Sequence, residues 1–248
     1  APSPVTALLH AAVLVKIGVY VFARLFIATF SLDAFWHVVV PVIAGVSMLV
    51  SAAAALVETD LKRLIAYSTV SQIGFIFFGL SIGNTLSIAG GLLYIFMHGL
   101  AKGGLFLCAG IIEQNTKTKD ITKMGGLIFA MPITAISFLF CAFSVMGIPP
   151  FGGFFSKYLV FAGGVQSGHL WITAIFLFGA FLTILYLFRA FHLIFLGEPQ
   201  LNAVKEGSPV MLLSVALLAG LSLVAGILIS YPAQFVQAIV SQILGVAT

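Results

Sequence analysis

The sequence predicts an all-α polytopic membrane protein with about seven transmembrane helices. Of its 248 residues, 61% are hydrophobic and 7% are charged, whereas a soluble domain carries roughly a quarter of charged residues. The mean hydropathy is +1.21. The apolar runs are long and lack the alternation that is typical of a transmembrane β-barrel. These observations favour a helical membrane protein and exclude a soluble enzyme.

Seven apolar spans follow one another along the chain. They cover about residues 4–28, 35–57, 61–82, 86–113, 130–147 together with 153–164, 169–195, and 208–239. Pro2 and Pro4 open the first span, where proline suits the first turn of a helix. Pro41 lies near one end of the second span, and the charged turn of residues 58–63 follows it. Within that turn, Asp60 is placed to cap the third span.

Short turns and one polar loop separate the later spans. Asn84 and Thr85 form the turn before the fourth span, and the polar loop of residues 113–123 follows it. Pro232 is expected to end or bend the seventh span. Because the longest polar stretch has about a dozen residues, we expect residues 1–248 to form a single transmembrane domain.

The fifth apolar region is expected to be a broken helix. At ~1.5 Å per residue it is too long for one straight crossing of a ~30 Å hydrocarbon core. Between Ile148 and Gly153, Pro149 and Pro150 remove two backbone donors, and Gly152 and Gly153 tolerate unusual backbone angles. A break that faces lipid would leave polar groups unpaired, so we expect this one inside the protein or against a watery cavity.

Basic residues predict the orientation of the chain in the membrane. One end receives Lys62, Arg63, Lys117, Lys119, Lys123 and Lys205, whereas the other has Arg24. The positive-inside rule then places the N-terminal side and the basic loops in the cytoplasm. The membrane would be a prokaryotic inner membrane or its organelle equivalent. With the C-terminus on the outside, the broken region has to cross once.

Three lysines lie deep in the apolar spans, namely Lys16, Lys102 and Lys157. Near the centre of a helix each would cost roughly 2.5–3.5 kcal/mol on insertion scales. All seven acidic residues lie in or next to turns. The lysines are therefore hydrated, deprotonated or paired with a carboxylate from outside this chain. A buried lysine beside a broken helix predicts an ion pathway, and an interfacial lysine in a surface loop is the alternative for Lys157.

Two histidines accompany these lysines. His98 and Lys102 are four residues apart and share a helix face, and Tyr94 extends this line by one turn. We interpret the line as a polar seam with room for water; the alternative is that His98 is a satisfied core residue. His10 and Lys16 are six residues apart, ~9 Å along a helix, and could be joined through water.

Four motifs resemble those of a known family. They are residues 1–11 (APSPVTALLHA), 59–74 (TDLKRLIAYSTVSQIG), 98–107 (HGLAKGGLFL) and 147–157 (GIPPFGGFFSK). In this order they are similar to the signatures of the antiporter-like subunits of complex I, Mrp cation–proton antiporters and membrane-bound hydrogenases.

The resemblance implies a fold of fourteen helices with inverted repeats, of which this chain supplies helices eight to fourteen. It implies that Lys16, with His10, links two half-channels, that Lys102 beside His98 is central, and that Lys157 leads to the outer side. A glutamate and a second broken helix of the family would precede Ala1. We therefore expect either a partner chain that supplies the first half or a truncated chain.

The expected function is proton translocation within a larger redox-driven complex, with electron transfer in other subunits. No P-loop, dinucleotide fingerprint, CxxC pair or nucleophile elbow is present in the sequence, so we expect no cofactor, metal or redox site. The expected partners are other membrane subunits and lipid, not nucleic acid. The alternatives are a Na⁺/H⁺ exchange subunit of an Mrp-type assembly and a structural half-subunit without its own ion path.

Overall fold

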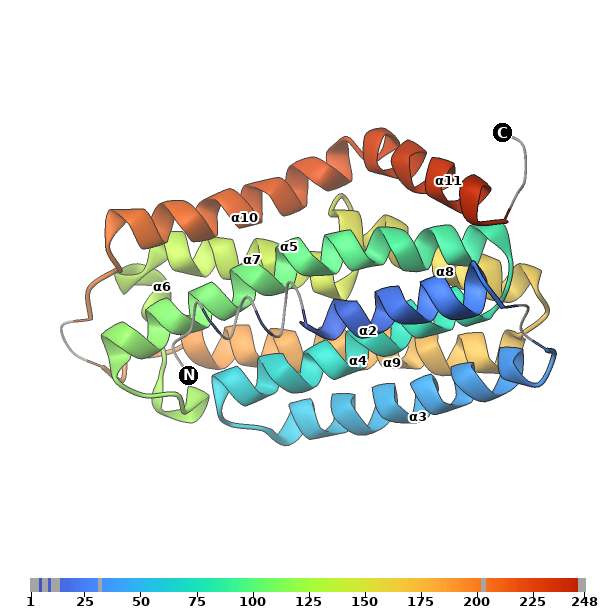
Figure 1. The fold of residues 1–248 in the computed structure, drawn as a ribbon. Helices are drawn as coiled ribbons and strands as arrows, with labels where there is room; N and C mark the ends of the chain where they lie inside the picture. Colours follow the sequence, from blue (N-terminus) through green and yellow to red (C-terminus); the bar gives the residue numbers. More distant parts are fainter. Residues whose placement is uncertain (1–4, 6–8, 10–13, 31–32, 202–203, 245–248) are drawn as a thin grey trace.

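The computed structural model describes the chain apart from residues 1–4, 6–8, 10–13, 31–32, 202–203 and 245–248. The described residues form helices that lie side by side along one direction (Figure 1). The helices are α2 (Leu14–Phe22), continued by the π-helical turn η2 (Ala23–Ile27), α3 (Trp36–Val57), α4 (Leu61–Ser81), α5 (Thr85–Thr116), η3 (Ile121–Lys123), α6 (Leu127–Ala130), α7 (Pro132–Met146), α8 (Gly152–Gln166), α9 (Leu170–Phe195), α10 (Pro209–Ile227) and α11 (Ser230–Leu244).

Within the described residues, five helices are long and apolar enough to cross a membrane, namely α3, α4, α5, α9 and α10. Helices α4 and α5 are mostly buried inside the bundle, whereas α3, α9 and α10 turn large apolar side chains outward. In water such an outer surface would be unfavourable, but it suits a bilayer. The predicted fold class, an all-α polytopic membrane protein, is confirmed.

Side-chain caps set where two central helices begin. The carboxylate of Asp60 accepts hydrogen bonds from the backbone nitrogens of Lys62 (2.9 Å) and Arg63 (3.1 Å), as expected of a cap for α4. Asn84 accepts from the backbone nitrogen of Ser87 at 2.7 Å and so caps α5. The amide nitrogen of Asn84 also donates to the Gly163 carbonyl at 2.9 Å, which ties the start of α5 to the end of α8.

The broken region crosses the bundle once. Helix α7 begins beside the loop that precedes α10, because Glu206 accepts a hydrogen bond from the Thr134 backbone nitrogen at 2.8 Å. Helix α8 ends at the opposite end of the bundle, next to the turn that holds Asn84. Figure 1 shows α7 and α8 following one another along the length of the bundle.

The helix break falls at residues 147–151, between α7 and α8, close to the predicted break from Ile148 to Gly153. Pro149 and Pro150 lie in the break, whereas Gly152 and Gly153 belong to the first turn of α8. Gly147 has a φ of +84°, and its backbone nitrogen donates to Phe143 at 3.0 Å, which closes the last turn of α7. The peptide bond between Pro149 and Pro150 is cis. A Cβ atom on Gly226 would collide with the Pro150 carbonyl oxygen, so α10 packs directly on the break. The irregular backbone is therefore covered by protein on this side.

The last predicted span is bent close to Pro232. Helix α10 ends at Ile227 and α11 begins at Ser230. Pro232 has no N–H to donate to the Leu228 carbonyl, and its ring clashes with that carbonyl, so the bend lies about one turn before the proline. Within α11, Pro232 lies in the first turn, where a backbone N–H would have no partner in the same helix. For the first span, α2 and η2 cover residues 14–27.

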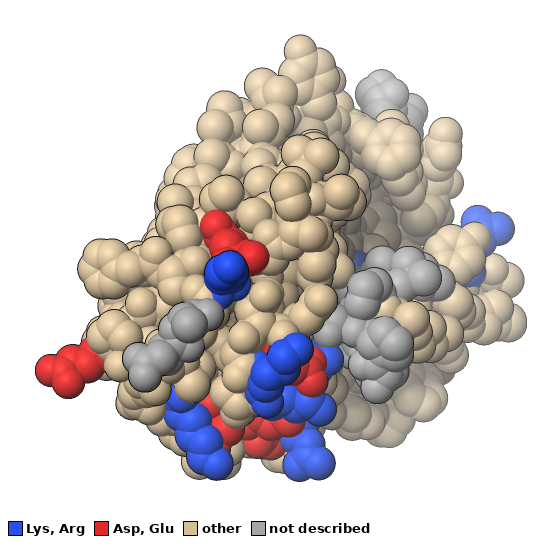
Figure 2. All heavy atoms as spheres, turned by 90° about the vertical axis from the view of Figure 1, so that its left-hand side faces the viewer, with Lys and Arg blue, Asp and Glu red and all other residues tan. Residues whose placement is uncertain are grey.

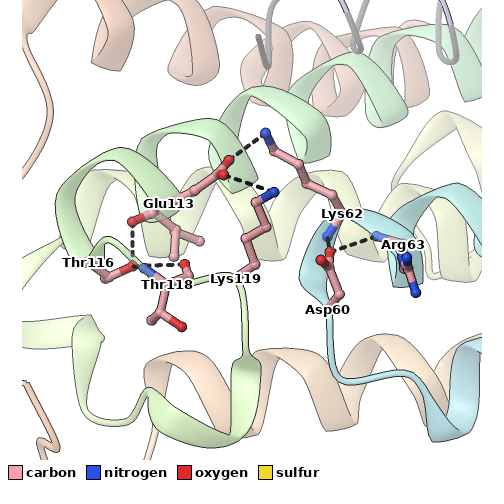
Figure 3. A network of polar contacts seen from close by, with 8 residues as sticks. Asp60, Lys62, Arg63, Glu113, Thr116, Thr118 and Lys119 are labelled. Carbon is pink, nitrogen blue, oxygen red and sulfur yellow. Dashed lines mark hydrogen bonds and ion pairs between the residues drawn. The ribbon is translucent and has the colours of Figure 1, made fainter. Parts of the chain in front are cut away.

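A polar clamp closes the end of the bundle where α4 begins and α5 ends. Glu113 of α5 pairs with Lys62 of α4 and, at 3.4 Å, with Lys119 of the following loop (Figure 3). The same loop is joined to the start of α4 by two backbone hydrogen bonds, from Leu61 to Lys119 (3.0 Å) and from Ile121 to Thr59 (2.9 Å). This clamp fixes the register of α4 against α5.

Lysine, arginine and acidic side chains gather on this end of the molecule (Figure 2). One of them, Asp120, accepts hydrogen bonds from the hydroxyl (2.6 Å) and the backbone nitrogen (3.0 Å) of Thr122. These two hydrogen bonds, with Lys123 at 3.7 Å, hold the pKa of Asp120 below its usual value.

Candidate functional site

Lys157 lies at the helix break. Its side chain is buried, and its amino nitrogen donates to the carbonyl oxygens of Val145 (2.7 Å) and Met146 (3.5 Å). Both carbonyls belong to the last turn of α7, where the break removes their helical partners. The partial negative charge of the α7 C-terminus therefore faces a lysine amine.

Two aromatic rings flank this amine. The Lys157 nitrogen lies 4.6 Å from the ring centre of Phe75 and 5.6 Å from that of Tyr94. Both distances are within the ~6 Å range in which a ring face attracts a cation. Helices α4, α5, α7 and α8 thus all contribute to the surroundings of Lys157.

Lys102 is fully buried in the middle of α5. Its amino group donates to the hydroxyl of Ser68 and, at 3.2 Å, to the carbonyl oxygen of Ile65, both on α4. The Ser68 hydroxyl in turn donates to Ile65 at 2.8 Å. The amine is held by neutral oxygens, as it is at Lys157.

His98 lies one turn before Lys102 on α5 and is also buried. Among the described residues, neither of its ring nitrogens has a hydrogen-bond partner. Its ring contacts Tyr94 edge-on, with 5.8 Å between the ring centres. Tyr94, His98 and Lys102 are thus three buried polar side chains on successive turns of one helix, which is the arrangement that their spacing indicated.

Lys16 reaches the same stretch of α5 from α2. A Cβ atom on Gly99 would lie 2.6 Å from the Lys16 amino nitrogen, so the lysine packs directly against α5 beside His98. Lys16 is half-buried in the described chain and lines an apolar groove of about 970 Å³. Residues of α5 and of α11, such as Phe235, form other walls of this groove. His10 lies outside the described residues.

The sequence did not predict a buried hydrogen-bond network that joins α4 to α9. The Tyr94 hydroxyl donates to the side-chain oxygen of Gln72 at 2.6 Å. The amide nitrogen of Gln72 donates to the hydroxyls of Thr183 (3.0 Å) and Tyr186 (3.2 Å) on α9. A signal was present, because Ser68 and Gln72 are polar residues one helical turn apart in an apolar span.

The described site groups amines, an imidazole and hydroxyls around α5. Each of these groups can accept or donate a proton or a hydrogen bond, depending on its charge state. Discontinuous helices beside buried charges are characteristic of membrane transporters, where they form ion sites near the bilayer midplane. Fold and site together define an integral membrane protein with a discontinuous helix beside buried lysines.

The family follows from the sequence comparison. The family model described as "NADH:quinone oxidoreductase/Mrp antiporter, TM" matches residues 1–183, and the chain belongs to this family. The resemblance inferred from the four motifs is thereby confirmed.

Curated relatives include subunits of both kinds of complex. The chain is 34% identical over 228 residues to a subunit of the Na(+)/H(+) antiporter of Alkalihalophilus pseudofirmus, an alignment that covers 91% of this chain and 46% of that protein. It is 37% identical over 238 residues to a subunit of the NADH-quinone oxidoreductase of Escherichia coli, covering 94% of this chain and 38% of that protein. The chain thus spans less than half the length of these two relatives.

Solved structures share the fold. A chain of the Mrp complex from Dietzia sp. superposes with a TM-score of 0.92 at 23% identity, covering 98% of this chain and 54% of that chain. A chain of respiratory complex I from Thermus thermophilus gives a TM-score of 0.85 at 27% identity, covering 98% and 52%. The chain therefore belongs to the family of antiporter-like membrane subunits found in Mrp and complex I, and it shares their fold.

Proposed function

We propose that this chain translocates protons as an antiporter-like subunit of a larger redox-driven membrane complex. The protons move along a row formed by Lys16, His98, Lys102 and Lys157, with His10 beside Lys16 and with water between the side chains. Electron transfer belongs to other subunits.

The observation that carries this proposal is the surroundings of Lys157. Its amine lies inside the protein and donates to carbonyl oxygens that the helix break has freed. These neutral dipoles and ring faces favour the ammonium form less strongly than a carboxylate partner would, because none of them carries a full negative charge. A charge that arrives in a neighbouring subunit can therefore change the protonation of Lys157, which is the step that coupling requires.

Lys102, His98 and Lys16 extend the proposed path from Lys157 along and beyond α5. Lys102 has the same type of neutral partners, Ser68 and Ile65, and His98 stands one turn away. Lys16 reaches the backbone of α5 at Gly99, next to His98. We propose the order Lys16, His98 with Lys102, then Lys157, which follows these contacts.

The partners in this proposal are other membrane subunits. The relatives are more than twice as long as their aligned parts, so the first half of the fold comes either from a partner chain or from a longer form of this chain. The basic end of the bundle, with Lys62, Lys119 and Lys123, is proposed to face the cytoplasm.

The proposal is tested by proton flux in the assembled complex, reconstituted in vesicles, with Lys102→Ala and Lys157→Ala. Each substitution is expected to abolish most of the coupled flux while the complex still assembles. Lys123→Ala is the matched control, because this lysine lies on the surface and pairs with Asp120. Unchanged coupled flux in both variants would contradict the proposal.

A second candidate is Na⁺/H⁺ exchange, which the 34% identity to a subunit of a Na(+)/H(+) antiporter favours. In that case activity would depend on Na⁺ and would persist in the presence of a protonophore. A purely structural half-subunit would behave differently again, because its lysine substitutions would change assembly and leave flux intact.

A further inference from the structure

Gln72 is placed between the two most deeply buried lysines. It lies one turn from Ser68, the partner of Lys102, and it accepts the hydrogen bond of Tyr94, whose ring faces Lys157. Its own side chain is fully buried, as are those of Tyr94 and Thr183. A buried carboxamide that titrates at no ordinary pH cannot itself carry a proton, so its contribution has to be orientation.

The partners of Gln72 fix which way its amide points. The Thr183 hydroxyl donates to the Gly179 carbonyl at 2.9 Å, so its oxygen is left to accept from Gln72. The amide nitrogen therefore faces α9, and the amide oxygen faces Tyr94. Tyr94 in turn has to donate its hydroxyl proton to Gln72, at 2.6 Å.

This polarity matters because Tyr94 has a second acceptor nearby. Its hydroxyl lies 3.5 Å from the Val145 carbonyl oxygen, which also accepts the Lys157 amine at 2.7 Å. A Tyr94 hydroxyl without Gln72 would turn its proton to this carbonyl, because a buried donor seeks a partner. It would then compete with Lys157 for the same oxygen.

We propose that Gln72 is a positioning residue that keeps the Tyr94 hydroxyl off Val145 and so reserves this carbonyl for Lys157. Thr183 acts with it by holding the amide in the required orientation. This inference rests on the proposed proton path. It adds a residue that keeps the Val145 carbonyl available to the Lys157 amine.

The test is a double substitution measured by coupled proton flux in the assembled, reconstituted complex. Gln72→Met keeps the length of the side chain and removes its hydrogen bonds, and it is expected to lower flux about three- to tenfold, the factor that corresponds to one hydrogen bond. Tyr94→Phe alone keeps the ring beside Lys157 and removes the hydroxyl, and its flux is the reference for the double variant. The competing hydroxyl is absent from the double variant, so its flux should rise above that of Gln72→Met alone, toward this reference.

Restoration separates this role from simple packing, because a second substitution in a packing contact would add to the damage. Thr183→Val offers an independent route, since it removes one of the two acceptors of the Gln72 amide nitrogen and leaves Tyr186 as the other. Its loss of flux is expected to be smaller than that of Gln72→Met and should also be reversed by Tyr94→Phe. Thr173→Val is its control, because Thr173 makes the same hydroxyl bond to a carbonyl four residues earlier on α9.

The outcomes are separable. If Lys157→Ala abolishes flux but Gln72→Met and Thr183→Val leave it unchanged, the role of Gln72 is wrong and the proposed function stands. The same conclusion follows if Tyr94→Phe fails to restore flux in both variants. If the Gln72→Met complex does not assemble, the role of Gln72 is judged from Thr183→Val measured with and without Tyr94→Phe. If Lys102→Ala and Lys157→Ala both retain full coupled flux, the proposed function itself fails.

Discussion

At the scale of single residues, the buried lysines are held by neutral oxygens. Lys157 donates to two backbone carbonyls, and Lys102 donates to a hydroxyl and a carbonyl. The acidic residues of the chain all lie in or beside turns. Partners of this kind satisfy a buried amine in either charge state, because carbonyls accept from –NH₂ as well as from –NH₃⁺.

Ser68→Ala is predicted to impair transport through Lys102. It removes one of the two acceptors of this amine, and a hydrogen bond to a charged group contributes about 1.5–3 kcal/mol. We expect a partial loss of coupled flux, since Ile65 remains as an acceptor. Ser51→Ala is the control, because Ser51 is buried on α3 and bonds within its own helix. Equal flux in the two variants would contradict this role of Ser68.

The sequence revealed the lysines but not their partners. Lys102 and Lys157 stand out because charges are rare in apolar spans, and that reasoning is local. The acceptors are carbonyls and a hydroxyl of other helices, and Gln72 and Thr183 are separated by 111 residues. Such pairs exist only once the helices have packed. Lys16 is half-buried in the described chain, because its side chain lies along a groove.

At the scale of helices, α5 packs closely against the segment of α8 that contains Lys157. A Cβ atom on Gly90 would lie 2.6 Å from the backbone nitrogen of Val160 and 2.9 Å from the carbonyl oxygen of Ser156. Both are rigid backbone atoms on either side of Lys157. The position of this lysine across the bundle therefore depends on a glycine of the neighbouring helix.

Gly90→Ala is predicted to push α8 outward and to displace Lys157. Overpacking of this type costs about 1–3 kcal/mol, since backbone atoms cannot turn aside. We expect a lower melting temperature of the purified complex and reduced coupled flux. Gly220→Ala on α10 is the control, because a Cβ atom there meets nothing within 4 Å. A Gly90→Ala complex as stable and active as this control would exclude tight packing here.

The polar clamp is predicted to loosen in acid. Because hydrogen bonds from Thr122 lower the pKa of Asp120 in the folded state, its contribution is present above the unfolded pKa, near 4, and is lost as the pH falls through the folded value. Hydrogen exchange at the Ile121 amide, which bonds to Thr59, should therefore report extra opening below about pH 4. Asp120→Asn should remove that pH-dependent step, and a step that persists in the variant would assign it to another group.

Local chemistry explains which helix boundaries the sequence could predict. The break at 147–151 follows from adjacent prolines and glycines, whose backbone limits hold in any context. The bend at Leu228 follows from Pro232 in the same way, because a proline has no N–H to donate to the carbonyl four residues earlier and its ring clashes with that carbonyl.

At the scale of the whole molecule, charge separates the two ends of the bundle. The loops at the start of α4 and the end of α5 carry Lys62, Lys119 and Lys123, and Figure 2 shows basic and acidic side chains together on that face. At the opposite end, the residues that join the Asn84 turn to the end of α8 are uncharged; they are Asn84, Gly163 and Ser167. The asymmetry predicts that the basic end faces the cytoplasm.

Lys123→Cys and Gln166→Cys test this orientation in intact cells. Both positions are exposed and lie at opposite ends of the bundle, while the native Cys108 and Cys141 are buried and should react slowly. A membrane-impermeant maleimide applied from outside should label Gln166→Cys and reach Lys123→Cys only after the membrane is opened. The reverse pattern would invert the chain. It would also place Lys157, on the α8 half of the broken helix, nearer the cytoplasmic surface and reverse the direction of the proposed proton row.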